Sequence, residues 1–130
     1  MIRGMLLGIA VSVLAILPGA ASAQDAEAGA KVFMKCRACH QIGETAKNAI
    51  GPILNGVVGR KAGSIETFNY TAANKNSGIT WDEATLKDYL KNPRAKVPGT
   101  KMTFAGLQSE QEISDVIGYL EQFDASGKKK

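Results

Sequence analysis

Apolar residues recur at helical spacing in the last third of the chain. Ser109 and Glu112 form a capping box there, in which two side chains satisfy backbone N–H groups at the start of a helix. Behind this box the apolar positions are three or four residues apart, as on one face of a helix: Ile113, Val116, Ile117, Leu120 and Phe123. The pattern predicts a final amphipathic helix.

A second helical pattern lies between residues 80 and 93. Thr80 and Glu83 form another capping box, with Thr80 as the N-cap and Glu83 reaching back to it. The apolar face behind this box comprises Leu86, Tyr89 and Leu90. The helix is expected to end at Asn92-Pro93, because proline clashes with the preceding turn and has no N–H to donate.

A first helix is predicted from Asp25, its N-cap, to about Cys39. Gly29 lies inside it, and glycine costs a helix about 1 kcal/mol relative to alanine. This glycine either allows another backbone to approach closely or is simply tolerated. Residues 41–63 are rich in glycine and predict a long loop, and no stretch alternates as a strand would. The fold class predicted is all-α, with three main helices and long loops.

The first 23 residues have the form of a secretory signal peptide. Arg3 precedes an apolar run from Met5 to Leu17, and Ala21-Ser22-Ala23 supplies a cleavage site before Gln24. The run is about 13 residues, whereas a helix that crosses a bilayer needs about 20. We therefore expect an exported, periplasmic domain of residues 24–130. An uncleaved anchor that tethers the domain is the alternative.

Charge and composition restrict the class of partner. The formal net charge is +4, and removal of the signal peptide with Arg3 leaves about +3. Basic chains bind nucleic acids, anionic membranes or acidic proteins, and export argues against nucleic acid. Aromatic residues make up only 6% of the chain, so a flat apolar cofactor would complete a small core. The final Lys128-Lys129-Lys130 is expected to be a solvated, frayed tail without a function.

The run Cys36-Arg37-Ala38-Cys39-His40 carries the most specific chemistry in the chain. It has the C-x-x-C-H pattern of a c-type haem attachment site, in which two thiols form thioethers with the porphyrin vinyl groups. The histidine that follows the second cysteine is then held beneath the iron. His40 is the only histidine in the sequence, so a second histidine ligand from this chain is excluded.

Two other interpretations of the cysteine pair are less favoured. A redox-active dithiol usually lies in a βαβ unit, and no such unit is predicted here. A structural zinc site needs four ligands, whereas the chain offers two cysteines and one histidine. Covalent attachment of one haem c remains the favoured interpretation.

A methionine can fill the sixth position of the iron. After loss of the signal peptide only Met34 and Met102 remain, and Met34 lies two residues before Cys36 on the same side as His40. Met102 lies in an irregular loop between two helices, which can wrap around the opposite face. A lone methionine more often fills a core, but elimination favours Met102 as the axial ligand. Met/His ligation raises the reduction potential and closes the iron to substrates.

These motifs resemble those of class I cytochromes c of the short bacterial type, close to the mitochondrial protein. The resemblance rests on four blocks in order: C-R-A-C-H, residues 51–63 (GPILNGVVGRKAG), residues 70–81 (YTAANKNSGITW) and residues 98–106 (PGTKMTFAG). It covers almost all of residues 24–130. It implies the cytochrome c fold, with three helices and long loops around one covalently bound haem.

The resemblance also implies roles for residues around the haem. The carbonyl of Pro52 would accept the free ring N–H of His40, which fixes the ligand. Three residues would shield and bond the haem propionates: Arg60, Tyr70 and Trp81. A polar network beside Met102 would comprise Asn74, Tyr89 and Thr100. Gly29 and Phe33 would cross the last helix near Gly118 and Tyr119.

The ring of lysines that surrounds the haem edge in mitochondrial relatives is thinner here. Candidate docking cations that remain are Lys35, Arg37, Lys47, Arg94, Lys96 and Lys101. The implied function is that of a soluble, monomeric electron carrier, not an enzyme, that shuttles one electron between a cytochrome bc complex and a terminal oxidase or photosynthetic reaction centre. A membrane-tethered form, or a peroxidase or gas-binding protein after loss of the methionine ligand, are the alternatives.

Overall fold

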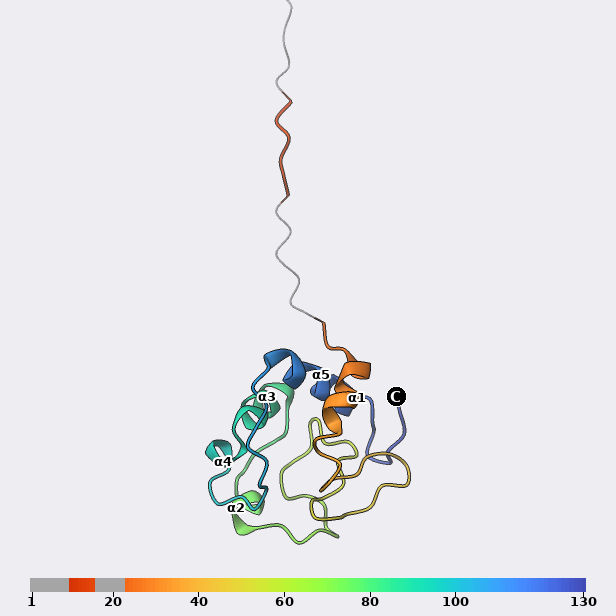
Figure 1. The fold of residues 1–130 in the computed structure, drawn as a ribbon, viewed down its shortest axis with the longest axis vertical. Helices are drawn as coiled ribbons and strands as arrows, with labels where there is room; N and C mark the ends of the chain where they lie inside the picture. Colours follow the sequence, from red (N-terminus) through yellow and green to blue (C-terminus); the bar gives the residue numbers. More distant parts are fainter. Residues whose placement is uncertain (1–9, 16–22) are drawn as a thin grey trace, which may run out of the picture.

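The computed structural model describes residues 10–15 and 23–130 of the chain. Their regular structure is helical, in the order α1 (Ala26–Phe33), α2 (Ala72–Lys75), α3 (Glu83–Lys91), α4 (Pro93–Lys96) and α5 (Glu110–Glu121). The described part contains no strand, only the isolated bridges Lys61–Thr80 and Phe123–Lys129. Helices α1, α3 and α5 gather at one end of the domain, and the long loops occupy the other (Figure 1). The prediction of an all-α fold with three main helices is confirmed.

Helices α1 and α5 pack directly on each other. Gly29 permits this, because a Cβ there would overlap the backbone carbonyl of Asp115 and lie 2.8 Å from the Cβ of Tyr119. One turn further along, the rings of Phe33 and Tyr119 lie with their centroids 5.2 Å apart. The close-approach interpretation of Gly29 is therefore correct.

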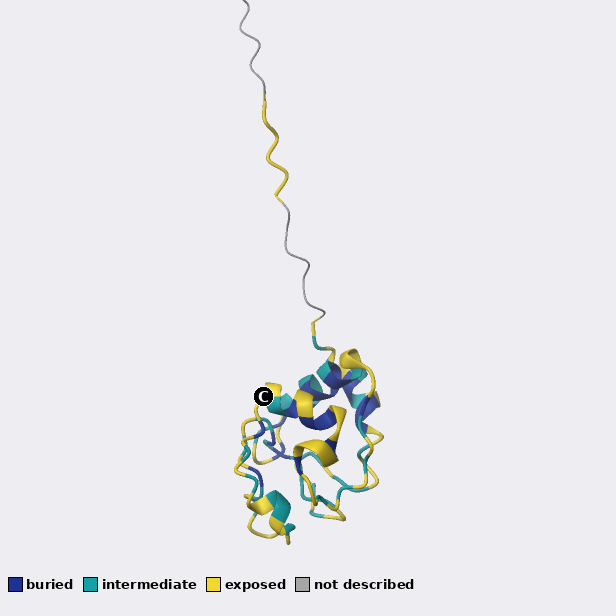
Figure 2. Ribbon diagram, turned by 90° about the vertical axis from the view of Figure 1, so that its left-hand side faces the viewer, coloured by how far each residue is buried: buried dark blue, intermediate teal, exposed yellow. Residues whose placement is uncertain are grey.

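The core lies beneath these helices. Ile117 of α5 is fully buried, and Ile113 and Val116 are each 2% exposed. Buried residues face the interior of the helical layer, while the outer helix faces and most of the loops are exposed or intermediate (Figure 2). Helix α3 contributes Leu86 and Leu90 to the same cluster. The three main helices thus contribute to one buried core, and the loops extend from them.

The first helix is shorter than predicted. Asp25 is its N-cap, with the side chain accepting hydrogen bonds from the backbone of Glu27 and Ala28, but the helix ends at Phe33. Beyond that point the backbone bonds change to the tighter i−3 pattern, as in Cys36 N–H to Phe33 carbonyl at 2.8 Å. Residues 34–39 consequently form turns and not a continuing helix.

The predicted N-cap at Thr80 is wrong. Asp82 caps α3, and its side chain accepts the backbone N–H of Thr85 over 2.8 Å. The reason is tertiary: Trp81 is 7% exposed and exchanges backbone hydrogen bonds with Arg60 and Gly59, so the chain stays extended through this point. The helix can begin only after Trp81 is placed in the core.

The prediction for the C-terminus is also wrong. Residues 124–130 fold back in a compact turn: the carboxylate of Asp124 accepts hydrogen bonds from the backbone of Ser126 and Lys128. Lys130 N–H bonds the carbonyl of Gln122 at 2.8 Å, and Gly127 is buried. The three lysines are solvated as expected, but their backbone is fixed.

Most of the proposed signal peptide, residues 1–9 and 16–22, lies outside the described part of the chain. Among the described residues, no helix has the length and apolar character needed to cross a membrane.

Candidate functional site

The C-x-x-C-H segment forms a tight turn at the end of α1. The backbone N–H groups of Cys39 and His40 both bond the carbonyl of Cys36, at 3.1 and 3.0 Å. Both cysteines are free and partly exposed. Burial, with a smaller contribution from Cys39, raises the pKa of the Cys36 thiol. The turn therefore presents two unpaired thiols beside one imidazole.

His40 is held by the next loop. Its ring Nδ1 lies 2.8 Å from the carbonyl oxygen of Pro52, as the resemblance implied. Burial lowers the pKa of His40, which favours the neutral ring that can ligate a metal. Because Nδ1 donates to Pro52, the other nitrogen, Nε2, carries the lone pair available for a ligand bond.

Gly51 fits against the face of this ring. A Cβ on Gly51 would lie 2.7 Å from Nδ1 and 2.8 Å from Nε2 of His40, so no larger residue fits without moving the imidazole. Its backbone N–H bonds the carbonyl of Cys39 at 2.8 Å. Gly51 therefore fixes both the backbone and the ring of the residue most central to the site.

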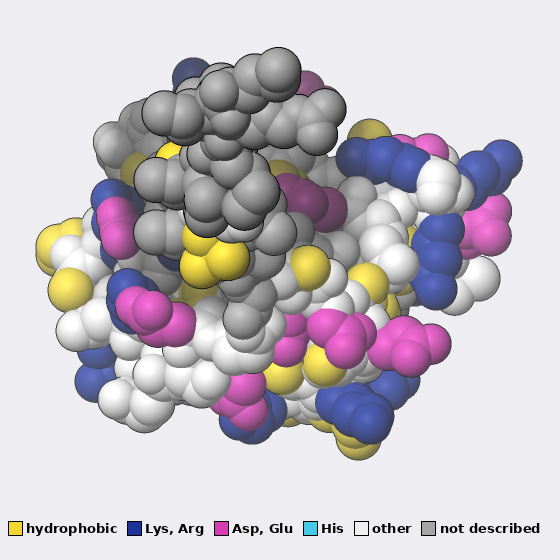
Figure 3. Space-filling view, turned by 90° about the horizontal axis from the view of Figure 1, so that it is seen from above, with side chains coloured by type: hydrophobic (Ala, Val, Ile, Leu, Met, Phe, Trp, Pro, Cys, Tyr) yellow, Lys and Arg dark blue, Asp and Glu magenta, His cyan; other side chains and the backbone are white. Residues whose placement is uncertain are grey.

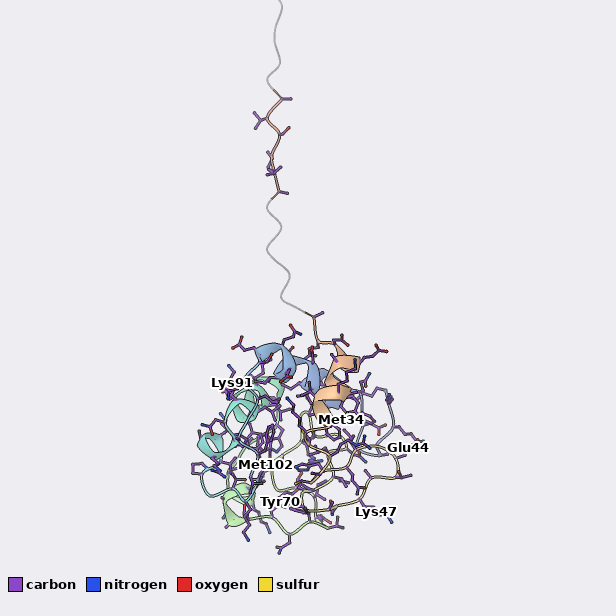
Figure 4. All side chains as sticks on the ribbon, viewed as in Figure 1. Met34, Glu44, Lys47, Tyr70, Lys91 and Met102 are labelled. Carbon is purple, nitrogen blue, oxygen red and sulfur yellow. The ribbon has the colours of Figure 1, made fainter. Side chains whose placement is uncertain are left out.

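Met102 lies in the loop between α4 and α5, and its sulfur accepts one hydrogen bond. The hydroxyl of Tyr89 donates to the Met102 sulfur over 3.0 Å, and Met102 N–H bonds the Thr100 hydroxyl oxygen at 3.2 Å. Met102 and Tyr70 lie in the loop-rich part of the domain near α2, while Met34 lies at the end of α1 (Figure 4). Met34 is 65% exposed, which agrees with its exclusion as a ligand.

Arg60 and Trp81 are joined through their backbones, because Trp81 N–H bonds the carbonyl of Arg60 at 2.9 Å. The guanidinium of Arg60 donates to the backbone carbonyls of Ile53 and Asn55, at 3.1 and 2.9 Å. Burial lowers the pKa of Arg60, although the group remains a cation at any physiological pH. The ring of Trp81 lies 4.6 Å from that of Tyr89, centroid to centroid. Trp81 therefore packs in the core and also contacts Tyr89, which belongs to the predicted polar network beside Met102.

Tyr70 lies just before the short helix α2, and Asn74 lies within that helix. The hydroxyl oxygen of Tyr70 accepts the backbone N–H of Ile65 at 3.2 Å, which leaves its proton available to another acceptor. Two buried polar atoms lack a partner within the described protein: Nε of Arg60 and Oδ1 of Asn74. Buried polar groups are nearly always satisfied, so both atoms indicate groups that the protein alone does not supply.

Comparison with known proteins identifies this arrangement. The sequence profile of the family "Cytochrome c" matches residues 26–124, which is most of the chain. The chain belongs to the cytochrome c family. It is a class I bacterial cytochrome c and an electron-transfer protein, as the motifs predicted.

Individual relatives are similar over their full length. The cytochrome c2 of Blastochloris viridis is 52% identical over 128 residues, covering 98% of this chain and 99% of that protein. A cytochrome c2 of Rhodoplanes tepidamans is 60% identical over 107 residues, covering 82% of this chain and 100% of that protein. The solved structure of cytochrome cH from Methylobacterium extorquens has 47% identity and a TM-score of 0.71, covering 75% of this chain and 98% of that one.

Cytochromes c carry one covalently bound haem c, and the residues present fit that group. The two free thiols stand at the required spacing with a neutral imidazole adjacent to them. The unpaired N–H of Arg60 is a donor suited to a haem propionate, which is an anion that needs partners when buried. Within the described residues, no three His, Cys, Asp or Glu side chains come together as a metal site.

Two of the six candidate docking cations form ion pairs with acidic side chains. Lys35 lies 3.4 Å from the carboxylate of Glu112, and Lys96 lies 3.7 Å from that of Asp88. All six have exposed side chains, including the four outside these pairs: Arg37, Lys47, Arg94 and Lys101. The face seen from the end where the N-terminal segment emerges mixes acidic and basic side chains (Figure 3).

Two residues of this site were missed from the sequence. Gly51 was noted only as part of a loop motif, and its contact with His40 depends on a fold that brings these two distant positions together. Asn55 is 6% exposed and bonds both backbone groups of Gly43. A polar residue among the apolar positions Leu54 and Val57 was the one available signal for Asn55.

Proposed function

We propose that this cytochrome c is a periplasmic one-electron carrier whose haem is attached at Cys36 and Cys39 and ligated by His40 and Met102. One observation carries the ligand assignment. Both proposed axial side chains are already oriented by a hydrogen bond, His40 by the carbonyl of Pro52 and Met102 by the hydroxyl of Tyr89. A side chain that merely fills space needs no such orientation.

The protein's own groups determine what the haem can do. A bound haem would supply one-electron chemistry. His40 and Met102 would both ligate its iron and so exclude water and substrates. The Pro52 carbonyl holds the imidazole basic, while the Tyr89 hydroxyl withdraws electron density from the thioether. Arg60, Tyr70 and Trp81 would surround the propionates, and Asn74 and Thr100 would complete the polar surroundings of Met102.

The location and partners follow from export and charge. Removal of residues 1–23 leaves 107 residues, which equals the full length of the matched Rhodoplanes tepidamans cytochrome c2. This supports cleavage before Gln24, and we propose that the cleaved domain is a soluble monomer in the periplasm. It would carry electrons from a cytochrome bc complex to a terminal oxidase or photosynthetic reaction centre. The six cations from Lys35 to Lys101 would steer it to acidic surfaces, and we propose no nucleic-acid partner.

The decisive experiment is the visible spectrum of the purified, reduced protein with and without carbon monoxide. A c-type spectrum that carbon monoxide leaves unchanged is expected for the wild type, because Met102 closes the sixth position. The variant M102A should bind carbon monoxide. The matched control M34A should not, because Met34 is exposed at the end of α1.

Each alternative has its own outcome in the same material. Binding of carbon monoxide to the wild type would replace the carrier function with gas binding or peroxidase activity. Absence of a covalent haem spectrum would revive the dithiol interpretation of Cys36 and Cys39. The intact mass decides the remaining question, since a mass that includes residues 1–23 indicates a tethered protein.

A further inference from the structure

The C-terminal tail, residues 124–130, forms a closed turn with its own internal bonds. The carboxylate of Asp124 accepts the hydroxyl of Ser126 at 2.7 Å and the backbone N–H of Lys128 at 3.0 Å. Asp124 N–H donates to the carbonyl of Lys128, and Gly127 N–H donates to the carbonyl of Asp124. These bonds give the tail a defined conformation, in which it packs against another loop of the domain.

The tail rests on the loop that follows His40. A Cβ on Gly127 would overlap the carbonyl of Gly43 and lie 2.7 Å from the side-chain nitrogen of Asn55. A Cβ on Gly56 would lie 3.0 Å from the backbone of Ala125. Gly127 is in the left-handed region, with φ of 83°, so the turn and the close contact both favour glycine there.

Asn55 joins the two sides of this loop. Its side-chain oxygen accepts the backbone N–H of Gly43 at 2.8 Å, and its side-chain nitrogen donates to the Gly43 carbonyl at 3.0 Å. Both backbone groups of Gly43 are thus satisfied by one buried amide. The Asn55 side chain thus forms the pair of hydrogen bonds that the backbone of a neighbouring β-strand would otherwise supply.

The same pairing continues back to His40. Leu54 N–H bonds the carbonyl of Gln41 at 3.0 Å, and Gly51 N–H bonds that of Cys39 at 2.8 Å. The contact between the Pro52 carbonyl and His40 Nδ1 lies between these two bonds. Residues 39–43 and 51–55 are therefore held in register from the cysteine turn at one end to Asn55 at the other.

We propose that Asn55 is a positioning residue for His40, and that the C-terminal tail holds Asn55 in place through Gly127. The inference rests on the proposed role of His40 as an axial ligand. Asn55 closes the open end of the paired segments, and the tail covers that end. Loosening the tail lets the segments shift, which lengthens the hydrogen bond from His40 Nδ1 to Pro52.

A longer bond at Nδ1 has two measurable consequences. The ring N–H exchanges faster with solvent, because its acceptor no longer protects it. The imidazole also becomes a weaker electron donor, so the ferric state is less stabilised and the reduction potential rises. A tail that served stability alone would leave the potential unchanged in the folded protein.

The test uses the haem-loaded protein and the variants N55A and G127A. Alanine at 55 removes both bonds to Gly43, and alanine at 127 displaces the tail from Asn55. The matched control is G78A: Gly78 also has a positive φ, of 70°, but its added Cβ meets no atom within 4 Å. The control therefore reproduces the backbone strain of G127A without a contact to Gly43 or Asn55.

The readouts are the solvent exchange of the His40 Nδ1–H, followed by NMR in the reduced protein, and the reduction potential. N55A and G127A should exchange about tenfold faster than wild type, equivalent to one net hydrogen bond. Both should raise the potential, and G78A should change neither. Should G127A fail to fold, a chain that ends at Ala125 removes the contact without adding bulk.

Two negative results have different meanings. A His40 resonance in the wild type without the shift of an axial ligand overturns the proposed function and this inference together. A wild-type resonance with that shift, but with exchange and potential unchanged in N55A and G127A, overturns the role of Asn55 alone.

Discussion

The hydroxyl of Tyr89 donates a hydrogen bond to the sulfur of Met102 over 3.0 Å. Tyr89 is only 8% exposed, and its ring packs against Trp81. Burial raises the pKa of Tyr89, so the hydroxyl keeps its proton at neutral pH and remains a donor. A thioether that accepts a hydrogen bond has less electron density to give to a metal.

The variant Y89F should therefore lower the reduction potential of the haem-loaded protein. Without the donor, Met102 becomes a stronger ligand, and the ferric state gains relative to the ferrous state. One net hydrogen bond is worth about 0.5–1.5 kcal/mol, which limits the shift to about 60 mV for one electron. Voltammetry measures it. Y119F is the control, because Tyr119 packs on Phe33 of α1 and should leave the potential unchanged. An increase in Y89F would contradict the role assigned to its hydroxyl.

Gly51 gives a second prediction, because a side chain there meets the His40 ring. G51A should lower the free energy of unfolding of the holoprotein by about 1–3 kcal/mol, the usual cost of overpacking. The fraction of chains that carry covalent haem should fall as well. The absorbance of haem per protein, together with denaturant titration, measures both effects.

G59A serves as the control for that experiment. Gly59 lies in the same loop and has φ of 89°, so alanine strains the backbone, but its Cβ would meet no atom within 4 Å. G59A should therefore lose some stability and still retain a normal haem content. Equal haem loss in both variants would mean that the loop backbone, and not the His40 contact, is responsible.

Much of this fold could be predicted because its determinants are local. The spacing of apolar residues and the Ser109 cap predicted α5, and Pro93 marked the end of α3 at Lys91. The C-x-x-C-H motif encodes its chemistry in a short run of neighbouring residues, so the amino-acid sequence alone predicts the residues that attach the haem. Each of these signals lies within one turn or one helix.

Two wrong predictions, the N-cap at Thr80 and the frayed C-terminus, both failed because of contacts between segments that are distant in the sequence. Thr80 has the right residue type for an N-cap, but the bonds from Trp81 to Gly59 and Arg60 delay the helix to Asp82. The lysines of the tail are typical of a frayed end, yet Gly127 fits against Gly43, far earlier in the chain. Such partners leave no periodic signal in the sequence, and only the folded chain brings them together.

The crossing of α1 and α5 gives a third prediction. G29A should destabilise the protein by about 1–3 kcal/mol, because the new methyl overlaps the Asp115 carbonyl, a rigid backbone group. G118A lies on the same pair of helices but meets the Gln24 side chain, 2.8 Å away, in the segment before α1. That contact is with a side-chain atom and not with the backbone of the facing helix, and alanine favours a helix by about 1 kcal/mol, so G118A should lose less stability than G29A. Denaturant titration of both variants compares them, and similar losses would contradict the close-approach role of Gly29.

A fourth prediction concerns Glu121 near the end of α5. Burial, and then the neighbouring carboxylate of Glu83, raise the pKa of Glu121, while Lys130 opposes the shift. The folded state therefore binds this proton more tightly than the unfolded state does. The stability that Glu121 contributes is present at acidic pH, and it is lost as the pH rises from the unfolded pKa through the folded one. At neutral pH the charged side chain is destabilising.

The variant E121Q should consequently be more stable than wild type at pH 7, because glutamine keeps the shape and removes the repulsion from Glu83. The gain should stay below about 1 kcal/mol, since the pair is open to solvent screening. Denaturant midpoints at pH 4.5 and pH 7 should show the advantage shrinking toward the acidic end, where Glu121 in the wild type is itself protonated. E44Q removes the same charge from an exposed loop residue and should show no such trend. A gain that is equal at both pH values would place its origin in helix propensity or packing, and not in the titration of Glu121.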